Sequence, residues 1–165
     1  MVAKIKFAKT HPDAVIPSKR PEDMGLDIYA CFDEDYIEIP PHETRLIPTG
    51  IASAYDPEWG IILRERGSTG LKAIKISAGV LDSGFRNVWF VCLYNGNDVP
   101  VYIAKYLDGE QSPCVEDAII YPYDKAIAQA IVLPVPELEI EEMPYLELQK
   151  IPSERGMGQL GSSNK

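Results

Sequence analysis

The chain is poor in histidine, cysteine and positive charge, and each shortage excludes a class of protein. Its 2 histidines, His11 and His42, cannot form a His-rich metal site and argue against a Ser-His-Asp triad. Its 3 cysteines are odd in number and widely spaced, which argues against a disulfide framework or a zinc cluster. A net charge of −9 argues against broad nucleic-acid binding, which needs a basic surface.

Long apolar runs are also missing. No stretch approaches the ~20 apolar residues that a membrane span requires, so we expect no membrane insertion. The N-terminus, MVAKIKFAKT, alternates lysine with apolar residues and lacks the continuous core of a signal peptide. Together with the cysteine usage, this predicts a cytoplasmic protein. The 165 residues, 45% hydrophobic, suffice for one domain with its own core.

Short apolar runs between turn signals dominate the rest of the chain. Many are β-branched or aromatic, and 14 prolines with 12 glycines interrupt the chain too often for long helices. Only residues 70–75 suggest a short helix. We therefore predict an all-β sandwich or jelly roll. Its expected strands are 2–7, 36–39, 60–64, 87–94, 99–104, 118–121 and 127–135.

Two segments are irregular. Residues 105–117 (KYLDGEQSPCVED) are polar and turn-rich, and we interpret them as a hairpin tip or an insertion. The Gly-rich C-terminus, RGMGQLGSSNK, is either a frayed terminus or a hinged arm whose Arg155 closes over an anion. The predicted organisation is a β domain over residues 1–150 followed by an arm over residues 151–165.

The most informative stretch is residues 78–86, AGVLDSGFR. It places Asp82 on a Gly-bracketed turn, with the ring of Phe85 three residues later. Such a turn offers backbone groups, one carboxylate and one aromatic face to a flat ligand. Asp-Ser-Gly is also ordinary hairpin chemistry, so a plain turn is the alternative.

Residues 64–72, RERGSTGLK, combine glycines, hydroxyls and cations, as phosphate recognition requires, although a solvated basic turn has the same composition. Asp27, in MGLDIYA, lies between apolar neighbours and should have a cationic partner, unless it faces outward on an edge strand. Gln129, in AIAQAI, is suited to a phosphate oxygen or to core backbone groups.

The order of these segments resembles the trimeric dUTP diphosphatases (dUTPases), which carry five motifs. MGLDIYA resembles the first motif, RGSTG the second, AGVLDSGFR the third, AIAQ the fourth and RGMGQLGSS the fifth. The resemblance implies a distorted jelly roll (a β-clip barrel) that forms a homotrimer. It also implies three active sites at subunit interfaces, each closed by a flexible C-terminal arm. The implied reaction is Mg²⁺-dependent hydrolysis of dUTP to dUMP and pyrophosphate.

The resemblance also implies roles for individual residues. Asp82 would orient the attacking water, and Phe85 would lie against the deoxyribose and exclude a 2′-hydroxyl. The backbone from Gly79 through Val80 to Asp82 would read the uracil edge. Asp27 would support the metal indirectly, with Mg²⁺ held mainly by substrate phosphates and water. The implied phosphate ligands are Arg66, Ser68, Gln129 and Arg155, with further substrate contacts from Arg64, Gly67, Thr69, Leu160, Gly161 and Ser162.

The chain departs from the family pattern at several points. Gly67 intervenes between the arginine and the serine of the second motif, so either Arg64 or Arg66 takes the arginine role. Ala126 stands where the fourth motif has arginine. Leu160 replaces the tail phenylalanine that stacks on uracil, and we expect a substitute ring after the third motif. The candidates are Phe90 and, slightly less favoured, Trp89.

Two other functions remain as alternatives. A dCTP deaminase would need a glutamate base where this chain has Cys92, and no carboxylate lies between Asp82 and Asp98. A non-catalytic dUTP sensor or protein-binding module would be signalled by loss of Asp82, which is present. Residues 105–117 remain a candidate surface for a protein partner alongside catalysis.

Overall fold

The computed structural model describes residues 2–113 and 115–158. The chain divides into two compact units, Met1–Val135 and Pro136–Lys165. The boundary that we expected after residue 150 falls inside the second unit. The regular secondary structure of the first unit is almost entirely strand, and this unit contains the first four sequence motifs.

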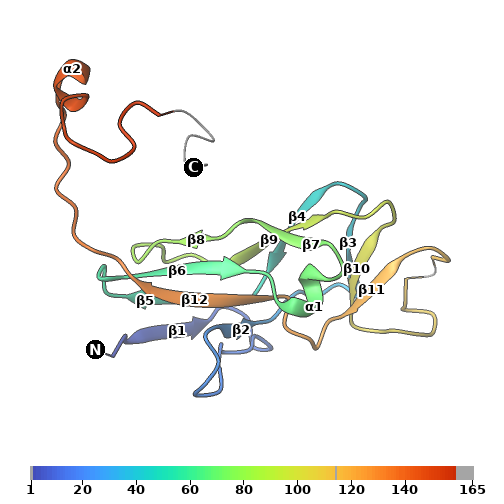
Figure 1. Cartoon of the computed structure of the whole chain (residues 1–165). Coiled ribbons are helices and arrows are strands. Elements are labelled where there is room, and N and C mark those ends of the chain that lie inside the picture. Colours follow the sequence, from blue (N-terminus) through green and yellow to red (C-terminus); the bar gives the residue numbers. More distant parts are fainter. Residues whose placement is uncertain (1, 114, 159–165) are drawn as a thin grey trace. The chain divides into compact units, whose positions relative to one another are not determined.

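Four small sheets make up the first unit (Figure 1). One has the order β2-β12-β6-β8, a second β4-β9-β7, a third β11-β10-β3, and the fourth pairs β1 with β5. All pairs are antiparallel except β10 with β11. The strands are β1 (Ile5–Lys9), β2 (Leu26–Ile28), β3 (Tyr36–Ile39), β4 (Thr44–Pro48), β5 (Ile51–Tyr55), β6 (Trp59–Arg64), β7 (Ile74–Ala78), β8 (Val80–Leu81), β9 (Phe90–Asn95), β10 (Val101–Ala104), β11 (Ile119–Pro122) and β12 (Ala128–Pro134).

A single apolar core lies beneath these sheets, and every sheet contributes to it. Burial alternates along β5 and β9, as expected for strands with one face on a core. The expected all-β jelly-roll class is confirmed. Large side chains that are almost fully buried include Ile28, Ile39, Ile47, Ile51, Ile61, Leu63, Trp89, Leu93 and Ile103.

The prediction of a helix over residues 70–75 is wrong. The helix α1 covers Gly67–Gly70, and Ile74 and Lys75 already belong to β7. Ile74 is buried in the core and pairs with Asn95 of β9, so tertiary packing overrides the local pattern. Ala73 has a positive φ of 53°, which ends the helical turn before the strand begins.

Strands β7 and β8 lie in different sheets, and a bulge with Gly79 carries the chain between them. The register of β7 against β9 shifts between Ile76 and Ala78. The Leu63 amide of β6 then donates to the Gly79 carbonyl (2.6 Å). A Cβ at position 79 would lie 2.5 Å from the Leu63 carbonyl oxygen, so only glycine allows this approach. This crossing delivers Asp82 to the end of β8.

Segment 105–117 connects β10 to β11, which are parallel neighbours. It is therefore a crossover and not the hairpin tip that we considered, because parallel strands cannot be joined by a tight turn. Lys105 anchors its start through a hydrogen bond from Nζ to the Asp33 carbonyl (2.9 Å). The same ammonium lies 5.4 Å and 5.3 Å from the ring centres of Phe32 and Tyr123. A protein partner for this segment stays a prediction.

In the described part of the second unit, residues 136–158, the one helix is the short α2 (Tyr145–Leu148), and the rest of this stretch is irregular. Many of its apolar side chains are exposed, among them Leu138, Ile140 and Leu146. Among the helices that the structure describes, neither has the length and hydrophobicity needed to cross a bilayer. The cytoplasmic location stays a prediction.

Candidate functional site

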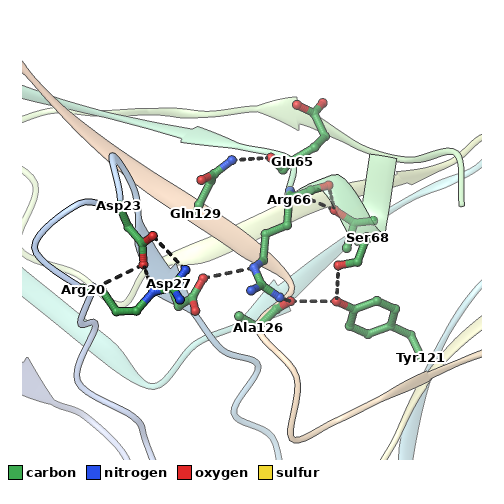
Figure 2. Close-up of polar contacts among 10 residues, drawn as sticks. Arg20, Asp23, Asp27, Glu65, Arg66, Ser68, Tyr121, Ala126 and Gln129 are labelled. Atoms are coloured by element: carbon green, nitrogen blue, oxygen red, sulfur yellow. Dashed lines mark hydrogen bonds and ion pairs between the residues drawn. The ribbon is translucent and has the colours of Figure 1, made fainter. Parts of the chain in front are cut away.

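An open pocket of about 880 Å³ lies where the loop before β2, the start of α1 and the start of β12 meet. It brings together residues of the first, second and fourth sequence motifs, which lie far apart in the chain. Figure 2 shows the polar contacts around it. The pocket is lined by Ser18, Lys19, Arg20, Asp23, Met24, Gly25, Asp27, Arg66, Gly67, Ser68, Lys125 and Gln129.

Asp27 has the cationic partner that its apolar surroundings required. Its Oδ1 lies 3.0 Å from Arg66 Nε, and both side chains are about one-third exposed. Arg66 also donates from Nη1 to the Ala126 carbonyl (3.4 Å; Figure 2). The guanidinium is therefore held from two sides at the wall of the pocket.

The structure separates the two candidate arginines of the second motif. Arg66 lines the pocket. Arg64, the last residue of β6, is 62% exposed at its side chain, contacts Glu65 (3.3 Å) and is not among the lining residues. Of the two candidate arginines, Arg66 is therefore the one that the structure places at the pocket.

Helix α1 presents Ser68 to the pocket and turns Thr69 away from it. Thr69 is 2% exposed, its hydroxyl donates to the Arg66 carbonyl (3.0 Å), and it accepts from the Arg66 amide (3.0 Å). Thr69 therefore fixes the turn as a cap, and the expected contact with substrate is replaced by this structural role. Ser68, by contrast, is exposed at the rim.

Tyr121 contributes to the site, although the sequence did not indicate it as a site residue. Its hydroxyl donates to the Ala126 carbonyl (2.8 Å) and lies 3.4 Å from Ser68 Oγ (Figure 2). A tyrosine at the end of an apolar run is typical of a core residue, and the Tyr121 ring is indeed buried. Only the fold shows that its hydroxyl links Ser68 to the carbonyl that also holds Arg66.

Gln129 lies on β12 opposite Asp27 of β2 and Arg64 of β6. Its amide nitrogen donates to the Glu65 carbonyl (2.7 Å), which satisfies one of its two N–H groups. Its Oε1 would lie 2.6 Å from a Cβ at position 25, so Gly25 is needed for this packing. The backbone interpretation of Gln129 is thus confirmed, and one N–H remains for a ligand at the pocket.

Glu65 supports the same wall from outside the pocket. Its Oε1 accepts the Ile76 amide (3.0 Å), which ties the end of β6 to β7. Burial raises the pKa of Glu65, but backbone hydrogen bonds and the charges of Arg64 and Lys75 outweigh it. The pKa therefore lies below its ordinary value of 4.5.

The Asp82 turn forms a second cluster. The Phe85 amide donates to the Asp82 carbonyl (3.0 Å), closing the turn, and the Asp82 and Phe85 side chains are exposed. The Tyr55 hydroxyl donates to the Leu81 carbonyl just before the acid. Burial raises the pKa of Tyr55, and the Asp82 carboxylate raises it further, so the hydroxyl keeps its proton. Arg86 donates to the Ser83 and Phe85 carbonyls across the turn.

A single chain does not bring these two clusters together. Arg66 follows the end of β6, whereas the β8 register places Leu81 opposite Ile61, near the start of β6. Asp82 therefore continues toward Gly60. Gly60 and Arg64 are separated by a rise of about 14 Å along the strand. Asp82 is not among the residues that line the pocket.

The candidate rings differ in accessibility. Trp89 is 1% exposed and packs edge-on against Phe7, with ring centres 5.5 Å apart. Its ring is therefore part of the core and is not presented to a ligand by this chain. Phe90 is 40% exposed. Of the tail candidates, Arg155 lies in the second unit, where its Nε donates to the Gly158 carbonyl (3.4 Å). Leu160, Gly161 and Ser162 lie outside the described residues.

The donors in the described ranges do not form a ready metal site. Within residues 2–113 and 115–158, no group of three or more His, Cys, Asp and Glu side chains is placed to hold a metal ion. The pocket does contain two carboxylates, Asp23 and Asp27, and both are paired with arginines. This donor set suits a hard cation that arrives with its own phosphate ligands.

Comparison with known proteins agrees with this geometry. Residues 12–107 match the dUTPase family model. A deoxyuridine 5′-triphosphate nucleotidohydrolase of Nautilia profundicola is 30% identical, covering 98% of this chain and 99% of the relative. The Staphylococcus bacteriophage 80alpha dUTPase with dUPNHPP has a TM-score of 0.74 at 17% identity, covering 98% and 99%.

A further solved structure, a dUTPase from phage phi11 of S. aureus, has a TM-score of 0.68 at 19% identity. It covers 87% of this chain and 99% of its own, and it describes the coordination of a structural Mg(II) ion. The fold is thus that of the dUTPases, and residues of the first four motifs occupy one pocket and one turn. The family match over residues 12–107 and the full-length relative at 30% identity show that this chain belongs to the dUTPase family.

Proposed function

We propose that this chain hydrolyses dUTP to dUMP and pyrophosphate in the presence of Mg²⁺. The observation that carries the proposal is the pocket in which Arg66, Ser68 and Gln129 meet, in a member of the dUTPase family. Phosphoryl transfer asks the protein for positioning and charge stabilisation more than for covalent chemistry. The chain supplies these without a histidine or cysteine nucleophile.

The phosphate chain occupies the pocket. The Arg66 guanidinium and the Ser68 hydroxyl contact phosphate oxygens, and the remaining Gln129 N–H donates to another. Asp27 positions Arg66 and serves the metal only indirectly. When bound, Mg²⁺ adds positive charge across the phosphate oxygens, and Asp23 and Asp27 would accept hydrogen bonds from its water ligands.

The uracil binds at the free edge of β8. This strand ends the sheet order, and the Leu63 amide bonds the Gly79 carbonyl. In an antiparallel pair, hydrogen-bonded and non-hydrogen-bonded residue pairs alternate, so the N–H and C=O of Val80 point away from β6. These two groups can therefore form hydrogen bonds with an acceptor and a donor of a planar base. The exposed ring of Phe85 lies against the deoxyribose and leaves no room for a 2′-hydroxyl.

The Asp82 carboxylate orients a water molecule for attack on the α-phosphorus and accepts its proton. The bond between the α-phosphorus and the bridging oxygen breaks, and pyrophosphate leaves. The Tyr55 hydroxyl and Arg86 hold the carbonyls of the turn, so the carboxylate needs little reorganisation.

Because one chain separates Asp82 from the pocket, we propose a homotrimer in which each site combines the turn of one subunit with the pocket of another. An apolar outer face on β4 and β9 supports this assembly. Leu46 pairs with Cys92, and Leu46 is 61% exposed. Cross-strand partners share a face, so these two residues form an apolar patch that other copies can cover.

The family resemblance further supports a C-terminal arm that brings Arg155 to the terminal phosphate. Because Leu160 replaces the usual tail ring, Phe90 is the better candidate for contacting the base, since Trp89 is buried. Phe90→Ala should raise KM for dUTP while Leu160→Ala changes it little. An unchanged KM in the Phe90 variant would remove that role.

The direct test is pyrophosphate release from dUTP, dTTP, dCTP and UTP, each with Mg²⁺ and each with excess EDTA. We expect efficient turnover of dUTP alone and only with Mg²⁺. Comparable turnover of all four nucleotides would overturn the specificity of β8 and Phe85. Ammonia release from dCTP would instead identify a deaminase.

A further inference from the structure

The pocket contains four cationic side chains, and their partners differ. Lys19 donates from Nζ to the carbonyls of Arg20, Pro21 and Asp23, the last at 2.6 Å. Arg20 forms a two-point contact with the Asp23 carboxylate at 2.9 Å and 3.0 Å. Lys19 and Arg20 therefore serve mainly to hold their own loop together.

The two cations on the opposite wall are Arg66 and Lys125. Arg66 is paired with Asp27. Lys125 lines the same pocket and is exposed, and within the described residues its ammonium has neither a carboxylate nor a carbonyl partner. Of the four cations, Lys125 is thus the one whose charged group has no partner among the described residues.

The backbone around Lys125 is fixed, although its side chain is not. The Lys125 amide donates to the Pro122 carbonyl (3.2 Å). The next carbonyl, that of Ala126, accepts from Arg66 and from the Tyr121 hydroxyl. The Ala126 side chain, at the position where the fourth motif has arginine, is 2% exposed in the core. Position 126 therefore cannot present a cation to the pocket, whereas position 125 does.

We propose that Lys125 is a further phosphate-binding residue of this chain, contacting the phosphate chain beside Arg66. The inference rests on the proposed function and adds a residue that the motif positions do not include. A lysine on a short anchored loop acts as a mobile point charge, which adapts to phosphate oxygens without requiring a fixed geometry. It supplies charge to the substrate at little cost to folding, since it breaks no existing contact.

The test compares Lys125→Ala, Lys125→Arg and Lys125→Glu with the control Lys9→Ala, an exposed lysine outside the pocket. Lys125→Ala should lower kcat/KM for dUTP about tenfold, the scale of one charge-assisted hydrogen bond, mainly through KM. Lys125→Arg should retain most activity, and Lys125→Glu should lose more than the alanine variant. Thermal stability should not change, because the side chain has no protein partner.

Inhibition constants separate phosphate binding from a general disturbance of the site. Lys125→Ala should weaken inhibition by inorganic tripolyphosphate but leave inhibition by deoxyuridine unchanged. Equal weakening of both, or kinetics identical to those of Lys9→Ala, would overturn the role of Lys125. If the wild-type chain does not hydrolyse dUTP, the proposed function fails. Calorimetric binding of tripolyphosphate to wild type and Lys125→Ala then decides the Lys125 inference separately.

Discussion

Asp27 Oδ1 lies 3.0 Å from Arg66 Nε and joins strand β2 to the start of helix α1. The contact fixes the direction of a guanidinium that would otherwise sample several rotamers at the pocket wall. Both partners are about one-third exposed, so solvent screens the pair and its contribution to stability is small. In the proposed function, its main effect is to position the charge of Arg66 for the substrate.

Asp27→Asn tests this relationship. The amide keeps the shape but loses the charge, so we expect kcat/KM for dUTP to fall about tenfold while stability changes by less than about 1 kcal/mol. Glu43→Gln, which removes an exposed ion pair with Arg45, is the matched control and should leave turnover unchanged. A large stability loss with intact kinetics would assign Asp27 to folding alone.

Asp82→Asn should lower kcat by at least about a hundredfold, because the amide cannot accept a proton from the attacking water. The side chain is exposed, so the melting temperature should stay within a few degrees of wild type. Asp56→Asn, an exposed acid after β5, serves as the control. Wild-type kcat in a folded Asp82 variant would refute the mechanism.

Mixing two inactive variants tests whether sites are shared. Asp82→Asn and Arg66→Ala subunits, unfolded and refolded together, should regain about a quarter of the wild-type sites, because random assembly pairs two intact halves with that frequency. Each variant refolded alone provides the baseline. Activity that never exceeds this baseline would show that each site lies within one subunit.

Gly79→Ala should destabilise the first unit by about 1–3 kcal/mol, because the new Cβ meets the Leu63 carbonyl and forces a backbone shift. Gly70→Ala is the contrasting control, since nothing lies within 4 Å of its added Cβ, and it should be neutral or slightly stabilising. Denaturant unfolding measures both. Equal stabilities would contradict the close approach of β7–β8 to β6.

The depressed pKa of Glu65 predicts a pH dependence. A carboxyl group whose pKa is lower in the folded state stabilises the protein above its unfolded pKa. This stabilisation is lost as pH falls through the folded value. The difference in unfolding free energy between wild type and Glu65→Gln should therefore be constant near neutrality and shrink below pH 4.5. Denaturant titrations from pH 7 to pH 3 provide the measurement, and a gap that grows on acidification would be inconsistent with it.

Alternation located three strands with unequal accuracy. Residues 36–39 match the observed strand, residues 60–64 match it to within one residue, and the strand predicted over residues 2–7 begins at Ile5 and ends at Lys9. The local pattern over residues 70–75 predicts a helix, whereas residues 74–78 form a strand whose core contact is with the distant strand β9. Local pattern carries no information about such pairing.

The sequence indicated residues that belong to the site, but it did not indicate which of them contact one another. Sequence order indicated Asp27, Arg66, Ser68 and Gln129, and the fold brings them to one pocket. It did not indicate that Thr69 is turned inward or that Tyr121 bridges Ser68 to Ala126. The orientation of Thr69 follows from its cap with the Arg66 backbone, and the Tyr121 bridge depends on how β11 approaches α1, which no short motif records.

Strand β6 holds the carboxylate turn near its start and the phosphate pocket beyond its end. In the proposed trimer, an isolated subunit would have only the two halves of two different active sites. The dUTP turnover rate per subunit should then depend on protein concentration. It should stay constant while trimers persist and fall sharply once dilution dissociates them. Such a threshold would make assembly itself the step that switches the chemistry on.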